Sequence, residues 1–344
     1  MKNIIKNILI TLFVSIFILT IGFFSFMAYL QHFAKTPFKF LPTPSQSNNI
    51  NLIKIRHGES LSNIAKKLET SAIISNQYLF MILARYKGDS KNIKAGEYEF
   101  SNKDIPENIL DMLVRGKVKL YKITIPEGLN IKEIAEIVEK AGFGTSEDFI
   151  KNATDKIFIS SLGIEADSLE GYLFPETYFF PTETNHKKII SSMVHHFNKV
   201  FTPDWKDTCK KLGLTIHEII TLASIIEKET ANSAERPLIS SVFHNRLKRG
   251  MRLESDPTVI YAIPNFNGNI TKKDLLAPTP YNTYLINGLP SGPIANPGKL
   301  SIEAALFPPK SDFLFFVSKN DSTHYFSKNI KEHNLAVRKY QLNQ

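Results

Sequence analysis

One acidic side chain stands on the apolar side of a predicted helix, where a charge is unusual. In the segment 216–230, IHEIITLASIIEKET, apolar residues repeat at helical spacing and predict a helix with one buried side: Ile216, Ile219, Ile220, Ala223 and Ile226. At about 100° per residue, Glu227 falls on that same side, whereas Glu218 and Glu229 point roughly opposite.

A carboxyl group in apolar surroundings tends to keep its proton at higher pH, because burial penalises the charged form. Such a group can act as a general acid and protonate a departing glycosidic oxygen near neutral pH. The alternative is a structural carboxylate held by an arginine, and three arginines follow closely: Arg236, Arg246 and Arg252. The pattern alone leaves both interpretations open for Glu227.

Polar residues crowd the segments 235–262 and 277–298, which follow this helix. Pro and Gly fix loops there, while Asn, Thr and Tyr offer directional hydrogen bonds, as at the rim of a sugar-binding cleft. We expect sugar contacts from Asn245, Arg246, Asp256, Thr258, Tyr281, Asn282 and Thr283. Taken singly, each is more often a turn or cap residue, and Arg246 and Arg252 could instead hold Glu176, Glu254 or Asp256.

Aromatic residues gather in the run SLEGYLFPETYFF, residues 168–180, with two carboxylates among them. Such clusters usually build core, but sugar-binding clefts also combine aromatic faces with carboxylates. We expect this run to contribute to both, with Glu170, Tyr172 and Glu176 as further sugar-binding residues.

Two segments match without gaps at an offset of 70 residues. Each reads as a short strand, a Gly turn and a helix: Ile53, Ile55, Gly58, Leu61, Ile64 and Leu68 correspond to Ile123, Ile125, Gly128, Ile131, Ile134 and Val138. Ser60 and Asn130 can each cap the helix that follows, and Glu133 completes a capping box in the second copy. The spacing indicates one unit used twice.

The N-terminal region predicts a membrane anchor and a tether. From Ile8 to Leu30 the sequence is uncharged and long enough to cross a bilayer as a helix, whereas a cleaved signal peptide has a shorter apolar stretch. The segment 36–49 is rich in Pro, Ser and Asn and has no periodicity, so folding is expected to begin near Asn51. The lone Cys209 excludes an intramolecular disulfide, and we expect it to pack as a small apolar residue.

Three strings resemble the YceG-like family of endolytic murein transglycosylases: LASIIEKET, then ERPLISSVFHNRLKRGMRLESDPTVIYA, then APTPYNTYLINGLPSGPIANPG, with EGYLFPETY fitting the same pattern. The likeness extends from the predicted span to the C-terminus. The resemblance implies that Glu227 is the catalytic residue. It also implies cleavage between N-acetylmuramic acid and N-acetylglucosamine within strands, 1,6-anhydro ends, and work beside peptidoglycan synthases such as penicillin-binding proteins.

The first copy of the repeat also resembles a LysM module, a small βααβ unit that binds N-acetylated glycans in its family. Glycan binding and a merely structural role are equally open for it. A different class of function would be a wall-binding scaffold, in which the LysM-like copies attach to glycan and the C-terminal body has no activity. Within enzymes, the runner-up is a hydrolase that uses Glu254 or Asp256 as a second carboxylate.

We therefore expect an α+β protein with one N-terminal transmembrane helix, a LysM-like βααβ subdomain and a mixed α/β catalytic domain. The expected boundaries are a cytoplasmic tail 1–7, a span 8–30, a linker 31–50, a LysM-like subdomain 51–118 and a catalytic domain 119–344, of which 119–156 is a candidate second LysM-like repeat. The N-terminus is expected inside a cytoplasmic membrane and the body outside, on the periplasmic side. The net charge is +9, but no polybasic run concentrates it and no motif for nucleic-acid binding is present in the sequence. We expect no cofactor and no metal.

Overall fold

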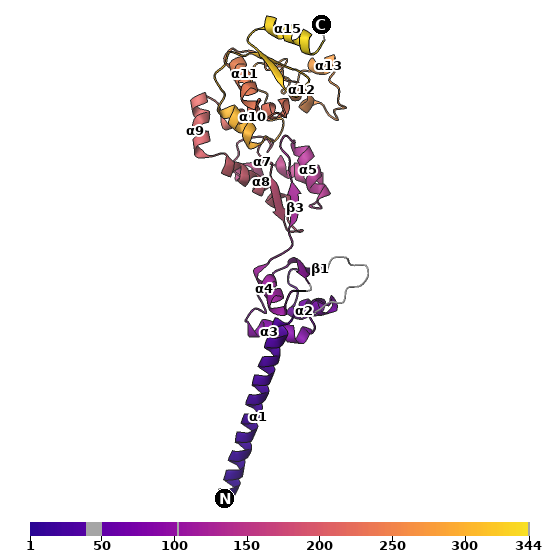
Figure 1. Ribbon diagram of the computed structural model, residues 1–344, viewed down its shortest axis with the longest axis vertical. Coiled ribbons are helices and arrows are strands. Elements are labelled where there is room, and N and C mark those ends of the chain that lie inside the picture. The colour runs from indigo at the N-terminus through magenta and orange to yellow at the C-terminus, as the bar shows by residue number, and fades with distance from the viewer. Residues whose placement is uncertain (39–49, 102, 343–344) are drawn as a thin grey trace. The chain divides into compact units, whose positions relative to one another are not determined.

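The computed structural model describes residues 1–38, 50–101 and 103–342, and it divides into two compact units (Figure 1). The first unit comprises Met1–Tyr121 with Pro181–Glu183, and the second comprises Lys122–Phe180 with Thr184–Gln344. Residues 39–49, most of the predicted tether, lie outside the described residues. Helices and strands occur in both units, which agrees with the expected α+β class.

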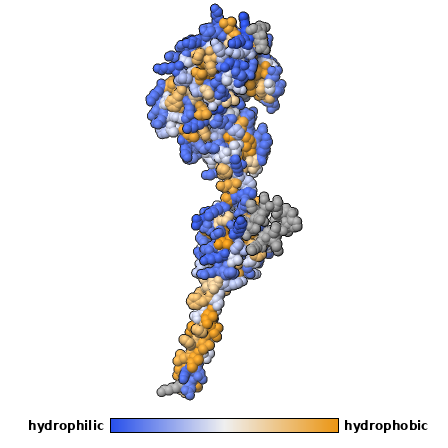
Figure 2. All heavy atoms as spheres, viewed as in Figure 1, coloured by the Kyte–Doolittle hydropathy of each residue, from blue (hydrophilic) through white to orange (hydrophobic). Residues whose placement is uncertain are grey.

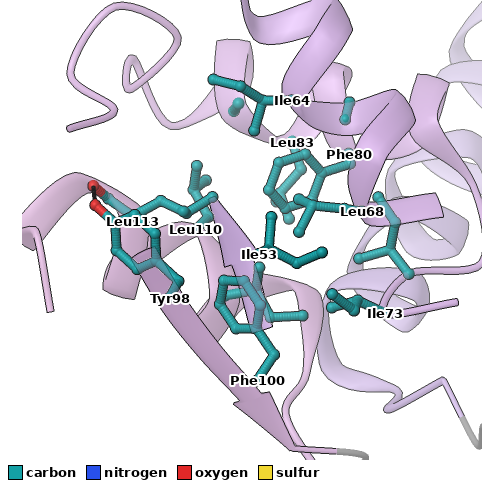
Figure 3. Packing of buried hydrophobic residues seen from close by; sticks show 14 of the residues in the cluster. Ile53, Ile64, Leu68, Ile73, Phe80, Leu83, Tyr98, Phe100, Leu110 and Leu113 are labelled. Atoms are coloured by element: carbon teal, nitrogen blue, oxygen red, sulfur yellow. Dashed lines mark hydrogen bonds between the residues drawn. The ribbon is translucent and has the colours of Figure 1, made fainter. Parts of the chain in front are cut away.

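The first unit holds a long N-terminal helix and a small α+β body. Its elements are α1 (Lys2–Lys35), β1 (Ile50–Ile55), α2 (Leu61–Thr70), α3 (Gln77–Tyr86), β2 (Gly96–Ser101) and α4 (Pro106–Arg115). The two strands pair antiparallel, with Ile53 opposite Tyr98. Side chains from β1, α2, α3, β2 and α4 meet in one core, in which Phe80, Leu68 and Tyr98 are fully buried (Figure 3). The order β1-α2-α3-β2 is the βααβ order predicted for residues 51–118.

The helix α1 is long and apolar enough to cross a bilayer, although a signal sequence near an N-terminus can meet the same test. Apolar side chains cover most of its exposed length (Figure 2). Its last turns behave differently, because Leu30, Phe33 and Ala34 are buried and α1 contacts α3 and α4. The expected linker at 31–50 is therefore wrong at its start: residues 31–35 are helical, since their apolar side completes the core of the first unit.

The second unit is larger and mostly helical. Its elements are β3 (Tyr121–Thr124), α5 (Ile131–Lys140), α6 (Ser146–Ala153), α7 (Lys156–Ser161), β4 (Thr177–Phe180), α8 (His186–Val200), α9 (Pro203–Leu212), α10 (Ile216–Glu229), α11 (Arg236–Lys248), α12 (Asp256–Ala262), α13 (Lys272–Leu275), α14 (Lys299–Leu306), β5 (Phe315–Ser318), β6 (His324–Ser327) and α15 (Ile330–Tyr340). The strands form two two-stranded sheets, β3 with β4 and β5 with β6.

The gapless repeat predicted from the sequence appears as matching strand, turn and helix. The first and last residues of α5 lie 70 positions after those of α2. Gly58 and Gly128, in the turns before these helices, both have positive φ. Ser60 accepts from the Asn63 backbone N–H, Asn130 accepts from that of Glu133, and Glu133 closes the capping box. The predicted caps are confirmed.

The predicted helix over 216–230 is α10, which ends at Glu229. A capping box between Thr215 and Glu218 begins it. Every residue from Ile219 to Ile226 is buried, because α10 contacts α9, α11, α12 and α14. This helix is therefore the centre of the second unit rather than a surface helix with one buried side.

Candidate active site

The carboxyl group of Glu227 is held by two donors inside the second unit. Its side chain is 6% exposed, and Oε1 accepts from Arg236 Nη2 at 2.8 Å. The backbone N–H of Gly298, just before α14, donates to Oε2 at 2.9 Å. The predicted burial of Glu227 is thus observed, and so is the alternative that an arginine pairs with it. Glu229, predicted on the opposite side, is withdrawn from water too, and burial raises its pKa to about 7.

Arg236 reaches this position because it opens α11, directly after a turn that connects it to α10. The preceding residue, Glu235, accepts from the backbone N–H and Nδ1 of His324, which fixes that turn to β6. The Arg236 side chain is 8% exposed, so its charge is withdrawn from water together with that of Glu227. A buried pair of this kind is costly to break, because either partner alone would be an uncompensated buried charge.

A second carboxylate faces the same arginine. Oε2 of Glu127 lies 3.8 Å from Arg236 Nη1, and the Glu127 side chain is 47% exposed. Partial burial raises the pKa of Glu127, the charge of Glu227 raises it further, and the charge of Arg236 lowers it. The site therefore contains two carboxylates and one guanidinium, with Glu127 on the more exposed side.

Backbone hydrogen bonds hold the Glu127 turn against the loop that carries Gly298. Gly128 N–H donates to Asn296 O at 2.9 Å, and Asn296 N–H donates to Leu129 O at 2.8 Å. These bonds join residues more than 160 positions apart in the chain. The turn of the second repeat copy is thus part of the site.

Glu170 lies beneath this loop and is 4% exposed. It accepts from Ile131 N–H, Tyr261 Oη and Asn296 Nδ2 at 2.9–3.2 Å. Burial raises the pKa of Glu170 to about 7, although these three donors act in the opposite direction. The prediction that Glu170 binds sugar is not supported, because its oxygens are occupied inside the fold.

The other residues expected at a cleft rim are mostly buried as well. Asn245 and Asn282 donate to backbone carbonyls in the segments 311–313 and 275–277, and Arg246 donates to the carbonyls of Arg252, Leu253 and Leu314. Thr258 and Thr283 are fully buried and bond to each other and to Ser255. Polar groups of all five residues bond to nearby backbone or to one another, and Arg246, Thr258, Asn282 and Thr283 are buried, which does not favour the expected sugar contacts for these four. Asn245 is half-buried, and a role for it in sugar binding stays a prediction.

Three of the predicted contacts keep some exposure. Glu176 is exposed and its carbonyl accepts from Ile125 N–H, while Asp256 is exposed and accepts from Tyr284 Oη at 2.6 Å. Tyr281 is half-buried and packs on Tyr261 with ring centroids 4.8 Å apart. A role for these three in sugar binding stays a prediction.

The aromatic run is core more than cleft wall. Tyr172, Phe174, Tyr178 and Phe180 are buried, and Tyr172 Oη bonds to His217 at 2.9 Å, so the predicted sugar contact of Tyr172 is corrected too. Phe179 alone of these aromatic residues is exposed. Cys209 is buried in α9, as expected of a small apolar residue.

The remaining charged groups pair locally. Arg246 Nη1 contacts Glu254 at 3.0 Å, as one sequence alternative proposed, whereas Arg252 donates to Tyr284 O. Glu254 and Asp256 thus have their own partners in the α11–α12 region. The carboxylate that shares an arginine with Glu227 is Glu127, which the sequence analysis did not single out.

Glu127, Gly298 and Asn296 are the site residues that the sequence analysis missed. One signal was available for Glu127, because the repeat places His57 at the equivalent position and the acidic residue before Gly128 therefore departs from the first copy. Gly298 follows the string GPIANP, where a loop was expected but not its contact with α10. Only the folded chain brings these residues together.

Comparison with known proteins places this geometry in context. The model of the YceG-like family matches residues 53–339. The endolytic murein transglycosylase of Bacillus subtilis (strain 168) is 36% identical over 315 residues, which cover 87% of each chain. That of Streptococcus pneumoniae serotype 2 (strain D39) is 31% identical over 86% of this chain, which spans 59% of that longer protein.

A solved structure agrees with these sequence matches. The crystal structure of a yceG-like protein from Listeria monocytogenes has a TM-score of 0.59 and 37% sequence identity. The match covers 83% of this chain and 98% of the other.

Replacing Glu170 by Gln should flatten the pH dependence of stability. The pKa of Glu170 is about 7 in the folded state, above its ordinary value of 4.5, so the folded state holds a proton that the unfolded chain releases. The resulting stabilisation is complete below pH 4.5 and is lost as the pH rises through about 7; it amounts to at most about 3 kcal/mol.

Thermal unfolding in detergent, measured from pH 4.5 to 8, tests this expectation. The melting temperature of the wild type should fall as the pH rises in that window, and the melting temperature of Glu170→Gln should fall less. Glu136 is an exposed residue of α5 whose one ion pair among the described residues is with Lys140, and it provides the control Glu136→Gln, which should follow the wild type. An unchanged slope in Glu170→Gln would contradict the assignment.

Proposed function

The chain belongs to the YceG-like family, and we propose that it is an endolytic murein transglycosylase with Glu227 as its general acid and base. Its substrate would be the bond between N-acetylmuramic acid and N-acetylglucosamine within nascent peptidoglycan strands. Cleavage would leave 1,6-anhydro ends and terminate strand elongation. The observation that carries the proposal is the carboxyl group of Glu227, fixed at the C-terminal end of the enclosed helix α10 beside a second, more exposed carboxylate.

One carboxyl group can serve both proton transfers in this reaction. Glu227 donates its proton to the glycosidic oxygen as the bond from that oxygen to C1 breaks. The C6 hydroxyl oxygen of the same sugar then bonds to C1 and gives its proton to the Glu227 carboxylate. The carboxyl group ends protonated as it began, and no water is consumed.

The surroundings of Glu227 suit the cationic character of the transition state. Glycoside cleavage passes through an oxocarbenium-like state, which negative charge nearby stabilises. When all three groups are ionised, Glu127, Glu227 and Arg236 carry a net negative charge. Arg236 and Gly298 N–H also fix the orientation of the Glu227 carboxyl group in this structure.

Hydrolysis is the second reaction that this geometry could support. A hydrolase needs a second carboxylate to activate water or to act as a nucleophile. Glu254 and Asp256 contact Arg246 and Tyr284, whereas Glu127 lies 3.8 Å from Arg236, the partner of Glu227, so Glu127 is our candidate for that second carboxylate. The two reactions differ in product by one water molecule.

We also propose that the first unit binds glycan, as its resemblance to a LysM module implies. A hollow of about 670 Å³ opens between the β1–α2 turn and the α3–β2 loop, lined among others by Arg56, Ser60, Ser90 and Ala95. Hydroxyl, amide and cationic groups on one open surface suit the hydroxyl and acetamido groups of a sugar chain.

The apolar length of α1 supports membrane anchoring of this activity. We propose a single span with the N-terminus inside and the body on the periplasmic side, where strands are made. Peptidoglycan synthases such as penicillin-binding proteins would be the partners there, because the enzyme would act on their product.

Glu227→Gln should remove activity while preserving the fold, since Gln has nearly the same shape but cannot donate or accept the proton. We expect release of fragments from purified peptidoglycan to fall by about 10²–10⁴-fold, the usual contribution of a general acid and base. Mass spectrometry of the wild-type products should show anhydro ends. Glu136→Gln is the matched control and should keep wild-type activity.

Two results would count against this function. Full turnover in Glu227→Gln would remove the residue assignment. Wild-type products with ordinary reducing ends, heavier by one water, would move the protein to the hydrolase class.

Ala95→Trp should weaken glycan retention by the first unit, because Ala95 is exposed and a large side chain there would fill the hollow. The test is sedimentation with insoluble peptidoglycan in a Glu227→Gln background, so that the polymer stays intact. Lys66→Trp, on the exposed side of α2 and outside the hollow, is the control. Equal retention of both variants would show that the hollow does not bind glycan.

A further inference from the structure

Glu227 presents a physical difficulty that its neighbours can resolve. A general acid must carry a proton, yet both oxygens of Glu227 accept hydrogen bonds, Oε1 from Arg236 and Oε2 from Gly298 N–H. Three charged side chains lie near Glu227. Arg236 from α11 pairs with it, Glu127 from the β3–α5 turn faces Arg236, and Lys228 from α10 donates from Nζ to Gly128 O at 3.2 Å. Among these, Glu127 is the group able to compete for Arg236.

The position of Glu127 is built into the backbone around it. The two residues after Glu127, Gly128 and Leu129, form backbone hydrogen bonds with Asn296. A Cβ atom added at Gly298 would lie 2.0 Å from both Cδ and Oε1 of Glu127, so the absence of a side chain at Gly298 makes room for this carboxyl group. Gly298 has φ −75°, which any residue can adopt, so here glycine is needed for space rather than for backbone conformation.

Arg236 retains a donor that could serve a second carboxylate. Its Nε atom is buried and has no hydrogen-bond partner among the described residues. An unpaired buried donor is unfavourable, and a guanidinium satisfies two of its donors at once in a bidentate pair with a carboxylate. At 3.8 Å from Nη1, Glu127 is within the reach of a small side-chain movement.

We propose that Glu127 is a positioning residue that draws Arg236 away from Glu227, so that Glu227 can hold the proton it donates. This inference rests on the proposed function of Glu227. In one arrangement Arg236 neutralises Glu227, and Glu127 remains charged toward solvent. In the other, Arg236 neutralises Glu127, and Glu227 takes up one proton from solvent.

The two arrangements differ by that proton alone, so the equilibrium between them depends on pH. Partial burial and the charge of Glu227 raise the pKa of Glu127, while the charge of Arg236 lowers it, as expected of three charged groups with Arg236 in contact with both carboxylates. The Glu227 side chain is 6% exposed and Arg236 Nη2 lies 2.8 Å from Oε1, so moving Arg236 would free that oxygen to hold the proton. Proton uptake and release of this hydrogen bond would then occur together.

The test is the pH profile of kcat/KM and of kcat on soluble glycan strands for the wild type and two variants. Glu127→Gln removes the competing charge, and Gly298→Ala displaces the Glu127 carboxyl group while keeping its charge. In both, Arg236 stays on Glu227, so the alkaline limb should move to lower pH by about one unit, with kcat near neutral pH reduced about tenfold and KM unchanged. Glu127→Asp should restore part of the loss, and Glu136→Gln should match the wild type.

A double-mutant cycle separates the shared mechanism from independent damage. In a Glu127→Ala background the side chain that Gly298→Ala would push aside is absent, so Gly298→Ala should add no further loss. Thermal unfolding of each variant, equal to that of the wild type, should accompany these results. Additive losses in the cycle would contradict a common action through Arg236.

The outcomes also distinguish this inference from the proposed function. If Glu227→Gln is inactive but Glu127→Gln keeps the wild-type pH profile, or changes KM alone, the role of Glu127 is overturned and that of Glu227 stands. If Glu227→Gln keeps full activity, both are overturned.

Discussion

The pairing of a nearly buried carboxylate with a nearly buried guanidinium, Glu227 with Arg236, is the interaction on which this site depends. Two charges out of water need partners and fixed geometry, and the second unit supplies both. The enclosed helix α10 carries Glu227, the first residue of α11 is Arg236, and the loop before α14 contributes a backbone donor. Because α10 contacts both α11 and α14, the same helix packing forms the core of the second unit and positions the residues of the site.

The repeated strand-turn-helix unit supports two different tasks. In the first copy the turn at Gly58 lines the hollow proposed to bind glycan. In the second copy the equivalent turn holds Glu127 beside Arg236, and the start of its helix donates to Glu170. The same local geometry, a positive-φ glycine before a capped helix, thus presents whatever residue precedes the glycine. The residue before the glycine is His57 in the first copy and Glu127 in the second, and only the second places a carboxylate beside Arg236.

Local rules predicted much of this structure, and long-range packing decided the rest. Helical spacing and capping residues predicted the helices α2, α5 and α10 and their first residues, because these signals lie within a few residues of one another in the sequence. The apolar spacing of α10 also singled out Glu227. The pattern did not decide between a catalytic acid and an ion pair with Arg236; the structure shows the pair. Asn282, Thr283 and Thr258 were expected to face a sugar and are buried instead, because Asn and Thr that fix a loop look the same in sequence as those that bind a ligand. Glu127 was missed since the contact with Arg236 spans more than 100 residues.

The most direct test of the central claim is a crystal structure of the Glu227→Gln protein with a murein oligosaccharide bound across the site. Because Gln preserves the shape of Glu, the scissile glycosidic oxygen should lie about 3 Å from the substituted side chain, with the C6 hydroxyl of the same muramic acid turned toward it. Binding that leaves every glycosidic oxygen beyond hydrogen-bond reach of position 227 would contradict the account.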